Sequence, residues 1–177
     1  CDAVAISGYA SVRNPAHERQ AAQAVRESLG VPVVCGHELT GALGFYERTV
    51  TAVLNAQLIP VIHGLIKAVQ QTMAQLNINA SIMVVRGDGS LMQADYAQER
   101  PVETILSGPA ASVMGAKFLS GCKDCLVVDM GGTTTDIAHL HAGECTISDE
   151  GAQIAGWQTK VRALQICTFG LGGDSKI

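Results

Sequence analysis

The stretch Asp129-Met-Gly-Gly-Thr-Thr-Thr-Asp136 is the most informative segment of the chain for both its structure and its chemistry. It begins at the end of an apolar run, residues 125–129, which predicts a buried strand. Residues 133–141 alternate weakly after it and predict a strand that returns antiparallel. An acid therefore ends one strand, two glycines turn the chain, three hydroxyls follow, and a second acid begins the return strand.

These residue types in this order suit phosphate binding. Gly131 and Gly132 let backbone N–H groups approach a phosphate, because no Cβ stands in the way. The hydroxyls of Thr133 and Thr134 can donate to phosphate oxygens. A carboxylate at Asp129 can hold Mg²⁺ through water, since Mg²⁺ keeps several of its waters. The alternative is an ordinary β-hairpin whose turn happens to be Gly-Gly.

Two further segments are candidates for ligand contact. In Ser107-Gly-Pro-Ala-Ala-Ser112, Ser107 or Gly108 is predicted to cap a helix that begins at Pro109, and the N–H groups of such an end attract anions. The alternative is an ordinary capped helix. In Gly170-Leu-Gly-Gly-Asp-Ser175, the turn of Gly170, Gly172 and Gly173 can pass close to a base or ribose, or it can be a flexible tail.

The rest of the pattern predicts an α/β fold in which a parallel section precedes a run of β-hairpins. Strands are expected at residues 3–7 and 31–35, with a helix between them that ends at Gly30, so this unit favours a parallel pair. The clearest helix covers residues 45–76, with a kink or break at Pro60. Other strands are expected at residues 81–85, 144–147 and 154–166.

Composition excludes several classes of protein. The chain has 177 residues, of which 47% are apolar and 16% charged, and this is too apolar for intrinsic disorder. Its formal net charge of −4 argues against a nucleic-acid partner. Polar residues interrupt the longest apolar stretch, so we expect no membrane span. Six scattered cysteines and no visible signal peptide favour a reducing cytoplasm.

Some polar groups have competing interpretations. Cys122 and Cys125, with His139, His141 and Cys145, have spacings that could serve a metal, but scattered Cys and His more often pack or lie on the surface. A second group, which could face a cleft, more simply forms a solvated first helical turn: Glu47, Arg48 and Asn55. Asp88 in the Gly87–Gly89 turn has an equally simple turn role.

Four segments together resemble one family. They are Tyr46-Glu-Arg-Thr with Leu54-Asn-Ala, Arg100-Pro-Val-Glu-Thr-Ile-Leu-Ser-Gly-Pro-Ala-Ala-Ser112, Val128-Asp-Met-Gly-Gly-Thr-Thr-Thr-Asp136, and Gly170-Leu-Gly-Gly-Asp-Ser175. In this order they are similar to the central hydantoinase A region of the hydantoinase/oxoprolinase family, over nearly the whole chain.

The resemblance implies a ribonuclease H-like fold of the acetate kinase, sugar kinase, heat-shock chaperone and actin group, present here in part. Residues 1–121 would end the first half, and residues 122–177 would begin the second half of a longer parent. The loop from Asp129 to Asp136 would be one of two phosphate loops that clamp ATP and Mg²⁺. Asp129 would hold the Mg²⁺ shell, Asp136 would orient the loop or a water, and residues 170–175 would lie near the adenosine.

The resemblance also implies an activity. The parent would be an ATP-dependent hydrolase that opens cyclic amides such as hydantoins or 5-oxoproline, while the segment alone would be inactive. A hydantoinase B-type subunit and an oligomeric parent are expected. The alternatives are an actin-like switch or assembly module and an ATP-dependent carboxylase subunit. Three residues depart from the family pattern and put the substrate in question: Gln165, Cys167 and Asp174.

Overall fold

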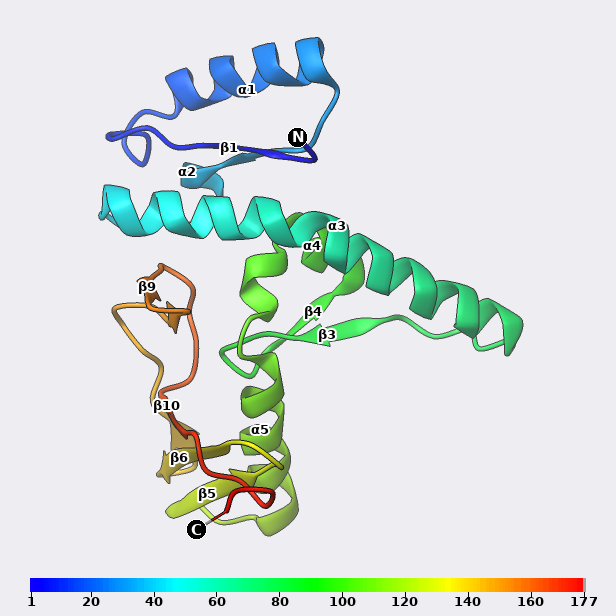
Figure 1. Cartoon of the computed structure of the whole chain (residues 1–177), viewed down its shortest axis with the longest axis vertical. Coiled ribbons are helices and arrows are strands. Elements are labelled where there is room, and N and C mark those ends of the chain that lie inside the picture. The colour runs from blue at the N-terminus through cyan, green and yellow to red at the C-terminus, as the bar shows by residue number, and fades with distance from the viewer. Residues whose placement is uncertain (177) are drawn as a thin grey trace. The chain divides into compact units, whose positions relative to one another are not determined.

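The computed structural model describes residues 1–176 of a mixed α/β protein (Figure 1). The chain divides into two compact units. Unit 1 comprises Cys1–Val84, Met92–Glu103 and Glu150–Val161. Unit 2 comprises Val85–Leu91, Thr104–Asp149 and the segment from Arg162 onward. The predicted halves, divided after residue 121, concern a longer parent and stay a prediction.

Unit 1 is built on the predicted parallel pair. Strand β1 (Val4–Ile6) pairs in parallel with β2 (Val33–Cys35), and α1 (Ala16–Leu29) connects them. Gly30 ends α1 with a φ of 63°, a left-handed conformation that glycine adopts without a steric penalty. Helices α1 and α3 lie on opposite sides of the two strands (Figure 1). The strand–helix–strand prediction is confirmed.

Helix α3 (Phe45–Gln75) matches the long helix expected from the sequence. It continues through Pro60 without a break and changes direction partway along its length (Figure 1). Its buried residues pack into two clusters, one with Val34 and one with Met92 and Ala97. By length and composition alone α3 is apolar enough to cross a membrane, and 39% of its most apolar window is buried in the protein.

Several short elements of the chain were not predicted. They are too short to show a period of their own, and tertiary contacts position them. These elements are α2 (Gly36–Leu39), β4 (Leu91–Gln93), α4 (Ala94–Glu99), η1 (Pro101–Thr104), β8 (Gln153–Ile154) and β9 (Trp157–Gln158). The strand expected at residues 81–85 is confirmed as β3 (Met83–Val85), which pairs with β4 in a hairpin that closes around Gly87–Gly89.

Unit 2 is an antiparallel sheet with one helix against it. Strands β5 (Cys125–Met130), β6 (Thr135–His141) and β10 (Ile166–Phe169) lie in the order β10-β6-β5, and β7 (Glu144–Cys145) also pairs with β6. Helix α5 (Ser107–Ser120) supplies Ala110 and Val113 to a core that also contains Ala138, Leu140 and Leu164. The predicted return of the chain in residues 133–141 is confirmed, beginning at Thr135.

The prediction of a buried strand at residues 125–129 is wrong for one of its faces. Side chains alternate along a strand, and α5 covers only one side of the sheet. Cys125 and Val127 pack toward α5, whereas Leu126, Val128 and Met130 are 67%, 56% and 58% exposed. The segment at 154–166 is likewise not one run of strand, because residues 159–165 hold only an isolated bridge at Leu164 before β10.

The predicted start of the second helix is also wrong. Helix α5 begins at Ser107, two residues before Pro109, and Leu106 takes the N-cap position with a φ of 64°. A proline in the first turn is tolerated because the N–H it lacks would have no partner inside the helix. Ser107 and Gly108 therefore lie within the first turn, and neither caps it.

Candidate functional site

The loop between β5 and β6 forms the tip of an antiparallel hairpin. Asp129 lies opposite Asp136 in the strand register, so the two acids flank the loop at a single rung of the ladder. The Gly131 N–H donates to the Thr134 carbonyl at 2.9 Å and closes the turn. The side chains of Thr133 and Thr134 are exposed. The residues predicted at this loop are thus placed together at one accessible edge.

The glycine turn at residues 170–175 lies directly against this loop. The Gly173 N–H donates to the Gly131 carbonyl, and the Asp174 N–H donates to the Gly132 carbonyl, both at 2.9 Å. The hydroxyl of Thr135 donates to the Leu171 carbonyl at 2.6 Å. Two segments about forty residues apart in the chain are therefore joined backbone to backbone, which the sequence pattern did not reveal.

The close approach explains why one of these residues is glycine. A Cβ on Gly172 would lie 2.4 Å from the carbonyl carbon of Gly132 and 2.5 Å from the Thr133 nitrogen. No side chain fits at that distance without a shift of backbone. By contrast, a Cβ on Gly170 would meet nothing within 4 Å. Glycine is thus required at Gly172 for packing of one turn on the other, while Gly170 has no such requirement.

Three consecutive backbone amides at the tip are free to bind a ligand. Within residues 1–176, the N–H groups of Gly132, Thr133 and Thr134 donate no hydrogen bond. Free amides beside threonine hydroxyls suit an anion with several oxygens, such as a phosphate group. The residues present therefore fit the phosphates of a nucleotide.

The two acids suit a cation. Like charges directly opposite each other across two strands are destabilising, by about 0.2–1 kcal/mol, and a cation between them offsets that repulsion. Asp129 is exposed, whereas Asp136 is half-buried and its Oδ1 accepts a hydrogen bond of 2.5 Å from the Thr168 hydroxyl. Carboxylate oxygens are ligands that Mg²⁺ accepts, directly or through water. The donor set fits Mg²⁺ beside a phosphate.

The sequence profile of the hydantoinase/oxoprolinase family matches residues 48–177 of this chain. The chain belongs to the hydantoinase/oxoprolinase family. The matched range contains both glycine turns and the first turn of α5.

Relatives from three organisms support the same family assignment. The chain is 34% identical over 177 residues to the caprolactamase subunit alpha of Pseudomonas jessenii, and 30% identical over 182 residues to the acetophenone carboxylase gamma subunit of Aromatoleum aromaticum. A 5-oxoprolinase of Pestalotiopsis fici is 31% identical over 180 residues. The chain aligns over 98% of its own length in all three, but it spans only a quarter of the first two and 13% of the third.

Solved structures show the same fold for the matched segment. The crystal structure of the ATP-dependent caprolactamase from Pseudomonas jessenii superposes with a TM-score of 0.83 and 34% identity. A nucleotide-free acetone carboxylase superposes with a TM-score of 0.80 and 23% identity. Each comparison covers 97% of this chain and 25% of the other.

The remaining predicted contacts are not joined to the loop. Ser107 and Gly108 make no hydrogen bond to residues 131–134 or 170–175 within the described chain. Gly170 precedes the stretch that packs on the loop. For this family member, the structure thus brings Gly131, Gly132, Gly172 and Gly173 together with the two acids and leaves the α5 end as a separate candidate.

The cysteines and histidines near the hairpin do not converge. In residues 1–176, the only set of three His, Cys, Asp or Glu side chains with ligand atoms within 4.8 Å of one another lies elsewhere, in unit 1. The Nδ1 of His141 pairs with Asp124 at 2.9 Å, and the rings of His139 and His141 stack with centroids 6.1 Å apart. Cys125 and Cys145 pack against the core of unit 2, whereas Cys122, His139 and His141 are exposed. Core packing and surface placement thus describe these side chains better than a metal site.

The set in unit 1 is Glu18, Cys35 and His37, and no sequence motif indicated it. The Glu18 carboxylate accepts from the Gly8 N–H at 2.6 Å, the Ser11 hydroxyl, the His37 N–H at 3.1 Å and the His37 Nδ1 at 2.5 Å. Burial raises the pKa of Glu18, but these hydrogen bonds outweigh burial and hold the pKa below its usual range. The carboxylate has no position left for a metal.

The thiol of the same set also argues against a metal. Burial, together with the Glu38 and Glu18 carboxylates, raises the pKa of Cys35 to about 11. The sulfur is therefore protonated at neutral pH in the metal-free protein, and a metal would have to displace this proton to bind. The set holds the strand ends in place.

The prediction of a solvated first turn at the start of α3 is wrong. Arg48 is 1% exposed and Asn55 is fully buried. The guanidinium of Arg48 donates to the carbonyls of Gly8, Tyr9 and Ala42 at 2.7, 3.1 and 3.3 Å. Asn55 donates to the Glu99 carbonyl and accepts from the Val102 N–H. These polar groups serve the fold because they join backbone groups of several segments through part-buried and buried hydrogen bonds.

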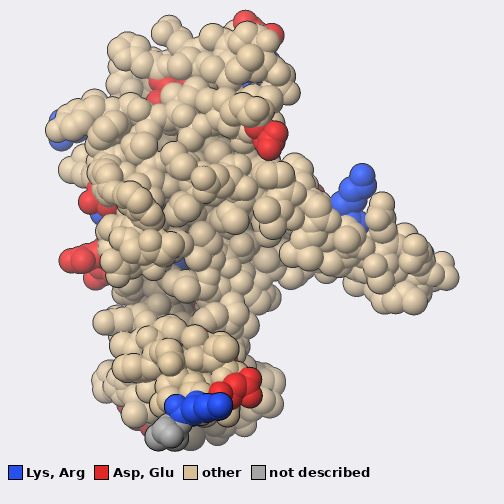
Figure 2. Space-filling model, in the orientation of Figure 1, with Lys and Arg blue, Asp and Glu red and all other residues tan. Residues whose placement is uncertain are grey.

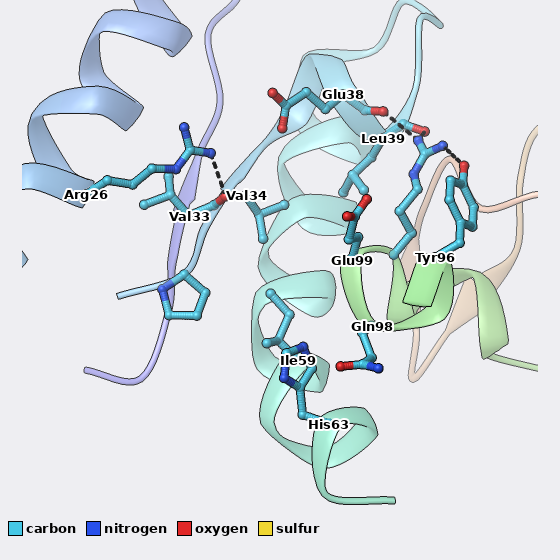
Figure 3. Close-up of a pocket in the computed structure, with 12 residues that line it drawn as sticks. Arg26, Val33, Val34, Glu38, Leu39, Ile59, His63, Tyr96, Gln98 and Glu99 are labelled. Atoms are coloured by element: carbon cyan, nitrogen blue, oxygen red, sulfur yellow. Dashed lines mark hydrogen bonds between the residues drawn. The ribbon is translucent and has the colours of Figure 1, made fainter. Parts of the chain in front are cut away.

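Unit 1 also contains a groove of about 610 Å³. Ile59 and His63 reach it from α3, and Gln98 and Glu99 reach it from α4 (Figure 3). Arg100 also lines the groove, and its guanidinium donates to the carbonyls of Glu38 and Leu39 at 2.5 and 2.6 Å. None of the predicted site residues lines this groove.

Charged groups are sparse on the face of the molecule drawn in Figure 2. Acidic and basic groups are scattered over it, and no basic patch is visible there. This distribution agrees with the net charge of −4 and with a small anionic ligand bound by backbone amides.

Proposed function

We propose that this chain is part of a longer ATP-dependent enzyme, in which it holds nucleotide phosphates, and that the enzyme opens a cyclic amide. The observation that carries this proposal is the pair of glycine turns, joined by two hydrogen bonds of 2.9 Å, with three free amides at the tip. Supporting it, the relatives and solved structures include a caprolactamase, a 5-oxoprolinase and an enzyme described as ATP-dependent.

Each residue of the loop has a proposed role. The amides of Gly132, Thr133 and Thr134 bind phosphate oxygens, and Gly172 lets the second turn support them. Asp129 holds the shell of the Mg²⁺ ion, while Asp136, fixed by Thr168, orients the loop or a water. ATP would supply a phosphoryl group that activates the amide toward water. The protein's contribution is positioning and charge stabilisation.

The proposed fold of the parent is the actin-like ATPase fold, with this loop as one of its two phosphate loops. An antiparallel hairpin that opens a sheet, covered by a helix on one side, supports that assignment. Ser107 and Gly108, at the start of α5, are proposed as a further contact to the nucleotide. Mg²⁺, a hydantoinase B-type partner subunit and an oligomeric parent belong to the same proposal.

A carboxylase is the second candidate. The acetophenone carboxylase gamma subunit is 30% identical over 98% of this chain, a match close to that of the caprolactamase subunit. In this alternative the same loop binds ATP, and bicarbonate and a ketone that accepts the carboxyl group replace water and the cyclic amide as reactants. The phosphate contacts proposed for the loop are common to both reactions.

The test is ATP turnover by the full-length protein that carries this segment, with Mg²⁺. The assay is run alone and with 5-oxoproline, hydantoin, caprolactam or bicarbonate. Stimulation by one cyclic amide is the expected result and names the substrate class. Stimulation by bicarbonate with a ketone would favour the carboxylase. Nucleotide binding without stimulation would favour a switch module, and absence of nucleotide binding would overturn the proposal.

A further inference from the structure

The carboxylate of Asp174 lies on the phosphate loop itself. Its Oδ2 is 2.6 Å from the position that a Cβ of Gly132 would take. The backbone of Asp174 is fixed there, because its N–H donates to the Gly132 carbonyl and the neighbouring Gly173 N–H donates to the Gly131 carbonyl. The side chain therefore covers one of the residues whose amide is free.

No basic side chain of the described residues neutralises this carboxylate. Among residues 1–176, no Lys, Arg or His pairs with Asp174, and its oxygens accept no hydrogen bond. Asp129 and Asp136 already place two carboxylates at the base of the same hairpin. Asp174 thus adds a third negative charge beside a loop whose free amides attract an anion.

We propose that Asp174 makes nucleotide binding at this loop dependent on a divalent cation. The inference rests on the proposed function, since it assumes that phosphates bind at Gly132–Thr134. A free triphosphate would meet the Asp174 charge directly, whereas a triphosphate with bound Mg²⁺ carries a cation that offsets it. Asp174 acts as a specificity-determining residue that selects the metal-bound nucleotide over the free one.

The size of the effect follows from Coulomb's law. One carboxylate about 5 Å from a doubly charged phosphate in a water-like dielectric weakens binding about tenfold. Removal of the charge should therefore favour free ATP by about this factor, while binding of the Mg²⁺ complex changes much less. The measurable quantity is the ratio of the ATP Kd in EDTA to the ATP Kd in Mg²⁺.

The experiment measures this ratio by calorimetry for the full-length protein and for Asp174→Asn, which keeps the shape of the side chain and removes its charge. Asp174→Ser serves as a second variant if the first does not fold. Asp149→Asn is the matched control, because Asp149 is another exposed acid of unit 2. The ratio should fall about tenfold in the Asp174 variants and stay unchanged in the control.

The outcomes separate the two proposals. If the natural protein binds ATP with Mg²⁺ but the ratio in Asp174→Asn equals that of the natural protein, the role of Asp174 is overturned and the phosphate loop stands. If Asp174→Asn loses binding of the Mg²⁺ complex, the carboxylate is a metal ligand and the repulsive role is likewise overturned. If no form binds ATP in Mg²⁺, the proposed function itself fails.

Discussion

The two units use polar residues in opposite ways. In unit 1, Glu18 and Arg48 are almost fully buried, and their charged groups are surrounded by backbone and side-chain partners. In unit 2, Asp129, Thr133 and Thr134 are exposed, and three amides beside them have no acceptor within residues 1–176. Within residues 1–176, most polar atoms of the first arrangement have partners, with Arg48 Nε and His37 Nε2 as buried exceptions, whereas the three amides of the second have none.

The difference shows which polar groups are available for function. A buried charge must be satisfied by its surroundings, because an unpaired one costs several kcal/mol, so Glu18 and Arg48 cannot be released to bind a ligand. Groups at an exposed hairpin tip lose little free energy when they exchange hydrogen bonds with water for hydrogen bonds with a phosphate. The comparison therefore assigns fold stability to the unit 1 cluster and ligand binding to the unit 2 loop.

The largest expected effect is the loss of ATP turnover in Asp129→Asn. Removing the charge that holds the metal shell should lower kcat at least about a hundredfold, because that charge stabilises the developing negative charge of phosphoryl transfer. Steady-state turnover of the full-length protein measures it, and circular dichroism should show an unchanged fold. Turnover equal to that of Asp149→Asn would remove Asp129 from the site.

In unit 1, Arg48→Met should lower the free energy of unfolding by about 3 kcal/mol. The substitution removes the donor of three part-buried hydrogen bonds to backbone carbonyls. Urea denaturation measures the change, and Arg19→Met, at an exposed position of α1, is the control with an expected change near zero. Equal stability of the two variants would contradict the structural role of Arg48.

Gly172→Ala tests the packing of the two glycine turns. The added Cβ would lie 2.4 Å from the Gly132 backbone, so the loop must shift by a fraction of an ångström or more. Overpacking of this kind costs about 1–3 kcal/mol, which predicts at least about tenfold weaker binding of the Mg²⁺–ATP complex. Gly170→Ala is the matched control, since its Cβ meets nothing within 4 Å. Similar affinities for both variants would disprove the steric coupling.

The smallest expected effect is on the pH dependence of stability. The folded state lowers the pKa of Glu18, so the unfolded chain binds more protons once the pH falls below the usual value of 4.5. Stability from this group is therefore present above pH 4.5 and is lost as the pH falls through the folded pKa. The unfolding free energy of Glu18→Gln should therefore fall less steeply with decreasing pH over this range than that of the natural protein, as measured by acid titration. Superimposable curves would contradict this assignment.

Local patterns predicted the elements that depend on neighbouring residues. The apolar period of α3, the strands around residues 125–141 and the glycine turn between them are all visible in short windows. The loop residues themselves were predicted for the same reason. The α5 start differed because Leu106 adopts a left-handed conformation that no propensity indicates.

Interactions between distant segments were not predictable. Arg48 binds carbonyls forty residues earlier in the chain, and the turn at Gly172 packs on Gly132, so a single sequence gives no sign of either contact. The open face of β5 is another case, because the alternation of its side chains shows two faces but not which of them a helix covers. The departure at Asp174 was visible in the sequence, but its place over Gly132 was not.

Hydrogen–deuterium exchange of the full-length protein, with and without the Mg²⁺–ATP complex, tests most directly whether the loop between β5 and β6 binds phosphates. The free amides of Gly132, Thr133 and Thr134 should exchange quickly in the absence of nucleotide and become protected when phosphates bind them. Peptides covering residues 131–135 and peptides covering residues 171–175 should both become protected when the nucleotide binds. Nucleotide binding that leaves both segments unprotected would contradict this prediction.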